Sequence, residues 1–178
     1  MAGTIGQYVE HHRGDLAELR RMDPDEPDAA AFWKLMAQYG LLDVGEAVER
    51  KWALIIHGIA LTTSTCSGEA NRVTAHNGQM PVGRALFLGG ESRRATGFYS
   101  EARLNRLLTA DGPMLRTLLA RMFRMLTASG VSFNWREMAQ FILNEGYDDD
   151  AAEQSRRRIA REYYRAERRS NKSNSESE

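Results

Sequence analysis

The chain has 178 residues, of which 42% are hydrophobic, so it can bury a core as one domain or as two small lobes. Its single cysteine, Cys66, excludes an internal disulfide and a thiolate zinc cage. The first residues lack the charged and apolar regions of a secretory signal, and the longest apolar stretch, 52–61, is too short to span a bilayer. We therefore expect a cytoplasmic protein.

The formal net charge is zero, but the charges are distributed unevenly along the chain. Residues 1–30 carry three arginines against seven acidic residues, whereas residues 81–136 carry nine arginines against three acidic residues. Because distant charges are screened within about 10 Å, an approaching polyanion responds to the local excess. Arginine, which also outnumbers lysine strongly here, suits forked contacts with phosphate. The composition therefore permits nucleic-acid binding despite overall neutrality.

Apolar residues recur at three- and four-residue intervals without sustained alternation, which predicts an all-α fold. A first helix is expected from Thr4 to about residue 22, ended by the proline-containing run 23–27. Asp28 is expected to cap a second helix that Gly40 ends. The inward side chains of this second helix are expected to be Phe32, Leu35 and Met36.

Residues 44–63 have the pattern of a central core helix, and His57 within it is expected to be a core histidine. Its predicted buried side comprises Val48, Trp52, Ile55, Ile56 and Ile59. A polar connection of unusual length follows at 64–80 and is typical of functional or disordered loops. We place the boundary of an N-terminal lobe, residues 1–80, at its end.

A C-terminal helical lobe is expected over residues 81–169. A short helix around 84–88 should break at the pair Gly89-Gly90, and Ser100 should cap the next helix. The sequence therefore predicts that the two lobes form an elongated helical bundle.

The rest of this lobe carries further start and stop signals. Asp111, followed by Pro113, should begin a long helix that Gly130 ends. Asn134 should cap another, and the acidic run 148–150 should begin a last helix to about residue 169. Residues 170–178 read as a disordered polar tail.

The helix expected from residue 112 is predicted to have one basic side. Arg116, Arg121 and Arg124 fall within an arc of about 140° when successive residues are turned by 100°. The opposite side is apolar and comprises Leu115, Leu118, Leu119, Met122, Met125 and Leu126. Because no acidic residue lies among the three arginines, the face would repel itself unless a polyanion covers it. Arg103 and Arg106 flank the leucines of the preceding helix.

The last helix also carries a strip of arginine, at positions 157, 161, 165 and 168. Here Glu153, Glu162 and Glu167 stand close enough along the helix to form neighbouring ion pairs. For this strip the pattern favours a solvated face.

Signatures of catalysis and metal binding are missing from the sequence. His11 and His12 are adjacent and would point about 100° apart on a helix, and His76 has no matching partner nearby. No HExxH, calcium-loop, nucleophile-elbow or phosphate-loop motif is present. We therefore expect no metal, no cofactor and no enzymatic activity.

Several segments, in this order and spacing, resemble the CasB family, the small subunit of the type I-E CRISPR Cascade surveillance complex. They are AELRRMDPDEP at 17–27, AAFWKLMAQYG at 30–40, PVGRAL at 81–86, SEARLNRLL at 100–108, NWREMAQFIL at 134–143 and RRRIAREYY at 156–164.

The resemblance implies a non-catalytic structural subunit with two copies in the complex. Such subunits lie beside the guide RNA and the target DNA strand and help to hold the displaced non-target strand of the R-loop, so the implied partners are these nucleic acids, other Cascade subunits and a second copy of the chain. The basic positions that match the family pattern are Arg20, Arg21, Lys34, Arg84 and Arg103. Helical periodicity adds Arg106, Arg116, Arg121 and Arg124 as candidate nucleic-acid-binding residues.

Two other functions remain open on the sequence. A helix-turn-helix regulator fits the helix pairs, although no helix carries the mixed Arg, Asn, Gln and Ser face that reads base edges. A helical enzyme would require a site that none of the motifs above indicates.

Overall fold

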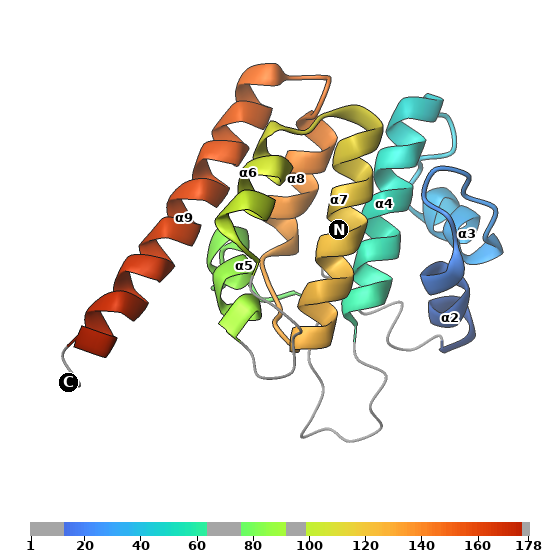
Figure 1. Ribbon diagram of the computed structural model, residues 1–178. Helices are drawn as coiled ribbons and strands as arrows, with labels where there is room; N and C mark the ends of the chain where they lie inside the picture. Colours follow the sequence, from blue (N-terminus) through green and yellow to red (C-terminus); the bar gives the residue numbers. More distant parts are fainter. Residues whose placement is uncertain (1–12, 64–75, 92–98, 176–178) are drawn as a thin grey trace. The chain divides into compact units, whose positions relative to one another are not determined.

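The computed structural model describes residues 13–63, 76–91 and 99–175, and within these ranges every regular element is a helix (Figure 1). The expected all-α fold is confirmed. An isolated bridge joins Asp23 and Glu26 in the turn after the first described helix. The chain divides into two compact units, residues 1–76 and 77–178.

The first unit contains α2 (Arg13–Arg21), α3 (Ala30–Gln38) and α4 (Glu46–Thr62), with α2 packed against both of the others. Thr4, the expected start of the first helix, lies outside the described residues. The core of this unit contains the predicted side chains of α3 and most of those of α4. His57 is buried, with its Nδ1 atom 2.9 Å from the carbonyl oxygen of Leu19, which confirms the expected core histidine.

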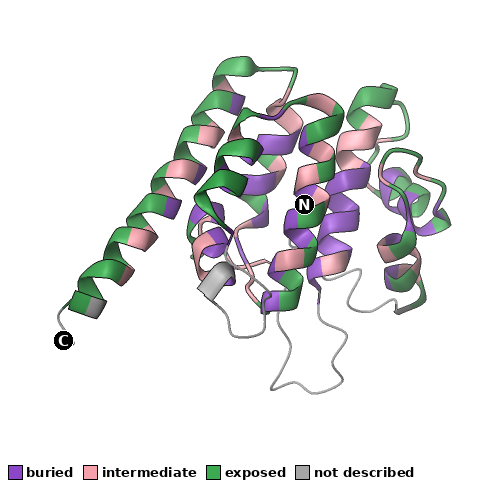
Figure 2. Ribbon diagram, viewed as in Figure 1, coloured by how far each residue is buried: buried purple, intermediate pink, exposed green. Residues whose placement is uncertain are grey.

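Two predictions about this unit are wrong. Val48 is exposed and Trp52 is only half-buried, because α4 is enclosed chiefly along residues 53–60, all of which are buried (Figure 2). Asp28 does not cap α3. The N-cap residue is Ala29, and the amide nitrogen of Ala30 donates instead to Glu18 Oε1 of α2 at 2.6 Å. A tertiary neighbour therefore takes the place of the local cap.

The second unit contains α5 (Val82–Glu91), α6 (Glu101–Thr109), α7 (Gly112–Ser129), α8 (Trp135–Asn144) and α9 (Asp149–Ser175). Helix α9 packs against α5, α8 and α6, while α7 packs against α5 and α6 (Figure 1). Within the core the rings of Phe123 and Phe133 each have a centroid 4.9 Å from that of Trp135. These aromatic contacts join α7 to the start of α8.

Residues 77–80 belong to the second unit because they pair with the segment before α8. The amide of Asn77 donates to the carbonyl of Phe133 at 2.9 Å, and the amide of Asn134 donates to the carbonyl of Met80 at 2.8 Å. The contacts thus divide the chain before these residues, whereas the sequence pattern predicts a boundary after residue 80. Most of the polar connection, residues 64–75, lies outside the described residues.

Close packing of α5 on α9 depends on Gly83. A Cβ atom at this position would stand 2.0 Å from the carbonyl oxygen of Ile159 and 2.7 Å from the amide nitrogen of Tyr163. Both are main-chain atoms of α9, so no side-chain movement could relieve the overlap. The phenolic oxygen of Tyr163 also donates to the carbonyl of Tyr99 at 2.8 Å, which links α9 to the chain before α6.

Several helix ends lie where local signals place them. Ser100 accepts a hydrogen bond from the amide of Arg103, and Asn134 accepts from the amides of Arg136 and Glu137. Gly40 and Gly130, which follow α3 and α7, both have φ angles in the left-handed region, at 66° and 67°. Asp111 is the N-cap residue of α7, but its side chain makes no capping hydrogen bond.

Two helix ends differ from expectation. Helix α5 continues through Gly89 and Gly90 to Glu91. Gly89 lies close to α7: its carbonyl accepts from Ser129 Oγ at 2.9 Å, and a Cβ would meet Leu126 Cδ2 at 3.0 Å. Packing therefore overrides the tendency of the glycine pair to break the helix. Helix α9 extends to Ser175, so residues 170–175 are helical, although the sequence predicts a disordered tail there.

Candidate nucleic-acid interface

Arg20, one of the candidate residues in the first unit, is engaged with the main chain. Its Nε atom donates to the carbonyl oxygen of Ala60 at 2.7 Å, and its Nη2 atom donates to that of Thr63. These carbonyls lie at the C-terminal end of α4, where a positive charge also suits the helix dipole. Burial lowers the pKa of Arg20. The guanidinium group therefore stabilises the packing of α2 on α4.

The other two candidates in this unit are exposed. Arg21 follows Arg20 at the end of α2, and Lys34 projects from α3 with its Nζ atom 3.7 Å from Asp15 Oδ1. A pair of this kind is weak because water screens it. The first unit thus offers two accessible cations from three candidates.

Helix α7 has the two-sided character that its periodicity predicts. Leu115, Leu119, Met122 and Leu126 are buried, while Leu118 and Met125 are half-buried. Arg121 and Arg124 are exposed, and Arg116 is half-buried. Within the part of the chain that the structure describes, neither Arg121 nor Arg124 has an ion pair or a side-chain hydrogen bond. Their charge is left available to an external anion.

Three further candidates lie on the helices that pack against α7. Arg84 is exposed on α5, and Arg103 and Arg106 are exposed on α6. No carboxylate pairs with Arg84 or Arg106 among the described residues. The second unit therefore holds six of the nine candidates, on three adjoining helices.

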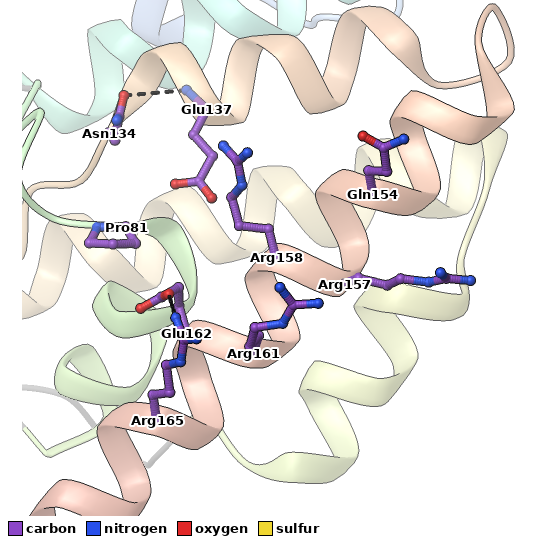
Figure 3. Close-up of a pocket in the computed structure, with 9 residues that line it drawn as sticks. All are labelled: Pro81, Asn134, Glu137, Gln154, Arg157, Arg158, Arg161, Glu162 and Arg165. Carbon is purple, nitrogen blue, oxygen red and sulfur yellow. Dashed lines mark hydrogen bonds and ion pairs between the residues drawn. The ribbon is translucent and has the colours of Figure 1, made fainter.

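A cleft of about 550 Å³ lies between α9 and the N-terminal ends of α5 and α8, and sequence reasoning did not identify it (Figure 3). Its lining comes from three separate parts of the second unit: Pro81, Asn134, Glu137, Gln154, Arg157, Arg158, Arg161, Glu162 and Arg165. The spacing of positions 157, 161 and 165 had indicated one face of a helix, but nothing in the sequence places Glu137 opposite that face.

Two of the four arginines of the cleft pair with glutamates of the same helix. Arg157 Nε lies 2.9 Å from Glu153 Oε1, and Arg165 Nη1 lies 2.6 Å from Glu162 Oε1. Both pairs confirm the helical-neighbour pairing expected for α9. Among the described residues no carboxylate pairs with Arg161, which is exposed.

Glu137 is the buried acid of the cleft, with 7% of its surface exposed. Its Oε2 atom accepts from the amide of Val82 at 3.1 Å and so caps α5, while its Oε1 atom has no hydrogen-bond partner among the described residues. Burial raises the pKa of Glu137; the hydrogen bond from Val82 and the charge of Arg158 act in the opposite direction, and Glu162 adds to the rise. Figure 3 shows the side chain of Arg158 extending from α9 toward this carboxylate.

Arg156, the first residue of the arginine run 156–158, has a structural role. Its Nη2 atom lies 2.6 Å from Glu145 Oε2 and 3.1 Å from the carbonyl oxygen of Ala110. The guanidinium carbon is also 5.4 Å from the centre of the Phe141 ring. The three consecutive arginines thus differ in function: Arg156 joins α9 to α8, and the other two line the cleft.

Within the described residues, no group of three or more His, Cys, Asp or Glu side chains is arranged to hold a metal ion. Cys66, His11 and His12 lie outside those residues. None of the described helices is both long enough and apolar enough for a membrane span.

The family model described as CRISPR-associated protein Cse2 matches residues 15–164. The chain belongs to the Cse2 family. This match confirms the resemblance to the Cascade small subunit, and the protein is a subunit of a CRISPR Cascade complex. Neither the curated proteins nor the solved structures that were compared with the chain give a match.

The Cse2 match spans the candidate surfaces almost completely. It includes all nine candidate basic residues and every lining residue of the cleft except Arg165. The exposed arginines of α7 and the cleft of α9 therefore both lie within the part of the chain that is typical of the Cse2 family.

Proposed function

We propose that this Cascade subunit is non-catalytic and holds the backbone of nucleic acid on the exposed arginines of its second unit. The observation that carries the proposal is the state of Arg121 and Arg124: both are exposed on α7 without a carboxylate partner among the described residues. Arg84 and Arg106 are also exposed, on two helices that pack against α7.

Backbone contacts of this kind suit RNA-guided recognition of DNA. The guide pairs with the target strand and displaces the non-target strand, an exchange that is nearly balanced in free energy. Arginines that bind the displaced strand then favour the open state without reading its sequence. In this role the protein contacts the guide RNA and target DNA backbone, other Cascade subunits and a second copy of itself, and it needs no cofactor.

The proposal is tested by the salt dependence of binding of the full chain to a labelled single-stranded DNA, measured by fluorescence anisotropy. The logarithm of the affinity should fall linearly with the logarithm of the salt concentration, with a slope of about −0.7 for each phosphate contacted. Replacing both Arg121 and Arg124 by alanine should therefore make the slope shallower by about 1.4.

Arg50→Ala is a matched control, because Arg50 of α4 already pairs with Glu46 on the same helix. This variant should bind with the wild-type slope. Equal slopes for the wild type and the double α7 variant would overturn the assignment of this face, and a complete lack of binding at low salt would overturn the proposed function itself.

A further inference from the structure

The cleft on α9 contains an acceptor that the fold itself does not use. Glu137 is buried, and among the described residues only its Oε2 atom accepts a hydrogen bond, from Val82. An isolated buried acceptor is costly, because the group loses its hydrogen bonds to water. A cap for α5 requires one oxygen, so capping accounts for Oε2 and leaves Oε1 unexplained.

The wall facing this acceptor is cationic. Arg157, Arg161 and Arg165 occupy positions four residues apart on α9, which places them about 6 Å apart along the helix axis. All three side chains are exposed, and Figure 3 shows them projecting from successive turns. A chain of phosphates can therefore lie along this wall and replace the solvent-screened contacts of Arg157 and Arg165 with their helical neighbours.

A ligand that satisfies both parts of the cleft carries an anion and a hydrogen-bond donor. A backbone phosphodiester meets the arginines but has no donor for a carboxylate oxygen. A nucleotide with an exocyclic amino group has both. The cleft volume of about 550 Å³ is within the range of sites that hold small molecules.

We propose that the cleft holds one unpaired nucleotide of a single strand, with its phosphates on the α9 arginines and its base amino group donating to Glu137 Oε1. Arg158, an exposed residue whose side chain extends toward Glu137, turns aside to admit the base. The inference rests on the proposed function, because it assigns to this subunit a preference among bases in addition to backbone binding.

A comparison of cytosine with thymine separates the contribution of the base amino group from that of the phosphate backbone. Cytosine presents an amino donor where thymine presents a carbonyl acceptor, while the backbone of the two strands is the same. A hydrogen bond to a charged group changes affinity by about tenfold or more. The wild type should therefore bind oligo(dC) about tenfold more tightly than oligo(dT) of equal length at neutral pH.

The decisive comparison is the ratio of these two affinities in Glu137→Gln. The amide oxygen of glutamine can keep the hydrogen bond from Val82, and its NH₂ group then replaces Oε1 with a donor. We expect the ratio to fall by about tenfold, or to reverse in favour of thymine, whose carbonyl accepts. Circular dichroism checks that the variant retains its helices.

Glu162→Gln is the matched control, because Glu162 lines the same cleft and the substitution removes the same charge. It should strengthen binding to both strands and leave the ratio unchanged. Arg158→Ala gives a second test that leaves the cap intact: removal of the side chain extending toward Glu137 should widen the preference for oligo(dC).

The outcomes separate this inference from the proposed function. If the wild type and Glu137→Gln bind both strands with the same ratio, and Arg158→Ala does not alter it, the nucleotide site is overturned while backbone binding stands. If the wild type binds neither strand at low salt, both proposals fail.

Discussion

Helices α7 and α9 both carry arginines along one side, but they use the charge differently. On α7, Arg121 and Arg124 have no carboxylate partner among the described residues, whereas on α9 Arg157 and Arg165 each pair with a glutamate of the same helix. Arg156 of α9 forms an ion pair with Glu145, the residue that follows α8. Arginine at helical spacing therefore does not show by itself whether the charge is already paired; the positions of the carboxylates decide that.

The largest expected effect follows from displacing α9 from α5. Gly83→Ala forces a Cβ against the main chain of α9, and we expect it to lower the free energy of unfolding by about 3 kcal/mol, near the upper end for overpacked sites. Urea denaturation followed by circular dichroism measures the loss. This change should disrupt the cleft more than the exposed face of α7.

Gly14→Ala provides the control for this substitution. Gly14 lies within α2, and no atom stands within 4 Å of the place that a Cβ would take, so alanine there should stabilise the protein by up to about 1 kcal/mol. Equal effects of the two substitutions would contradict the close contact between α5 and α9.

The next largest effect on stability is expected for Arg156, in contrast to its neighbour Arg157. Arg156→Ala removes a partly buried ion pair, a hydrogen bond to Ala110 and a contact with Phe141, and it should cost about 2 kcal/mol of unfolding free energy. Arg157→Ala removes an exposed pair and should change the free energy by less than about 0.5 kcal/mol. Similar values for both variants would remove the distinction within the arginine run.

A smaller effect depends on pH. The pKa of Glu137 is raised from its usual 4.5, so the folded protein holds this proton more tightly than the unfolded chain does. Between these two pKa values the contribution of Glu137 to stability is lost as the pH rises. Arg158 and Glu162 of α9 are the charged groups that act on it.

Glu137→Gln removes this titration. The free energy of unfolding of the wild type relative to the variant should therefore decline as the pH rises above about 4.5, as measured by urea denaturation at a series of pH values. A difference that stays constant across the series would contradict the raised pKa.

Local signals in the sequence predicted the helix ends that neighbours do not alter. Ser100 and Asn134 cap their helices with side chains, and Gly130 ends α7, because each depends only on residues within one turn. The predictions at Asp28 and at Gly89 failed because Glu18 of α2 and Ser129 of α7 supply tertiary contacts there. No short-range pattern contains those contacts.

The same distinction applies to the candidate surfaces. The basic side of α7 follows from periodicity, since the burial of its apolar side determines which way the arginines face. The cleft could not be predicted from periodicity. Its residues Glu137, Pro81 and Arg161 come from three parts of the chain, which are brought together only when α8 and α5 pack on α9. Arg20 likewise matches the family pattern, but its hydrogen bond to the main chain of α4 is seen only in the structure.

The smallest expected effect on stability accompanies the largest effect on function. Because Arg121 and Arg124 have no partners among the described residues, replacing both by alanine should change the unfolding free energy by less than about 0.5 kcal/mol. A larger loss, measured by urea denaturation, would mean that these side chains support the fold.

The central claim is tested most directly in the assembled Cascade complex carrying the Arg121→Ala, Arg124→Ala double variant. The measurement is the chemical reactivity of unpaired bases in the displaced DNA strand, which reports the fraction of target held open. We expect complexes with the variant to assemble normally and to hold a smaller open fraction than the wild type, with a difference that widens as salt is raised. An unchanged open fraction at every salt concentration would contradict the proposed role of α7.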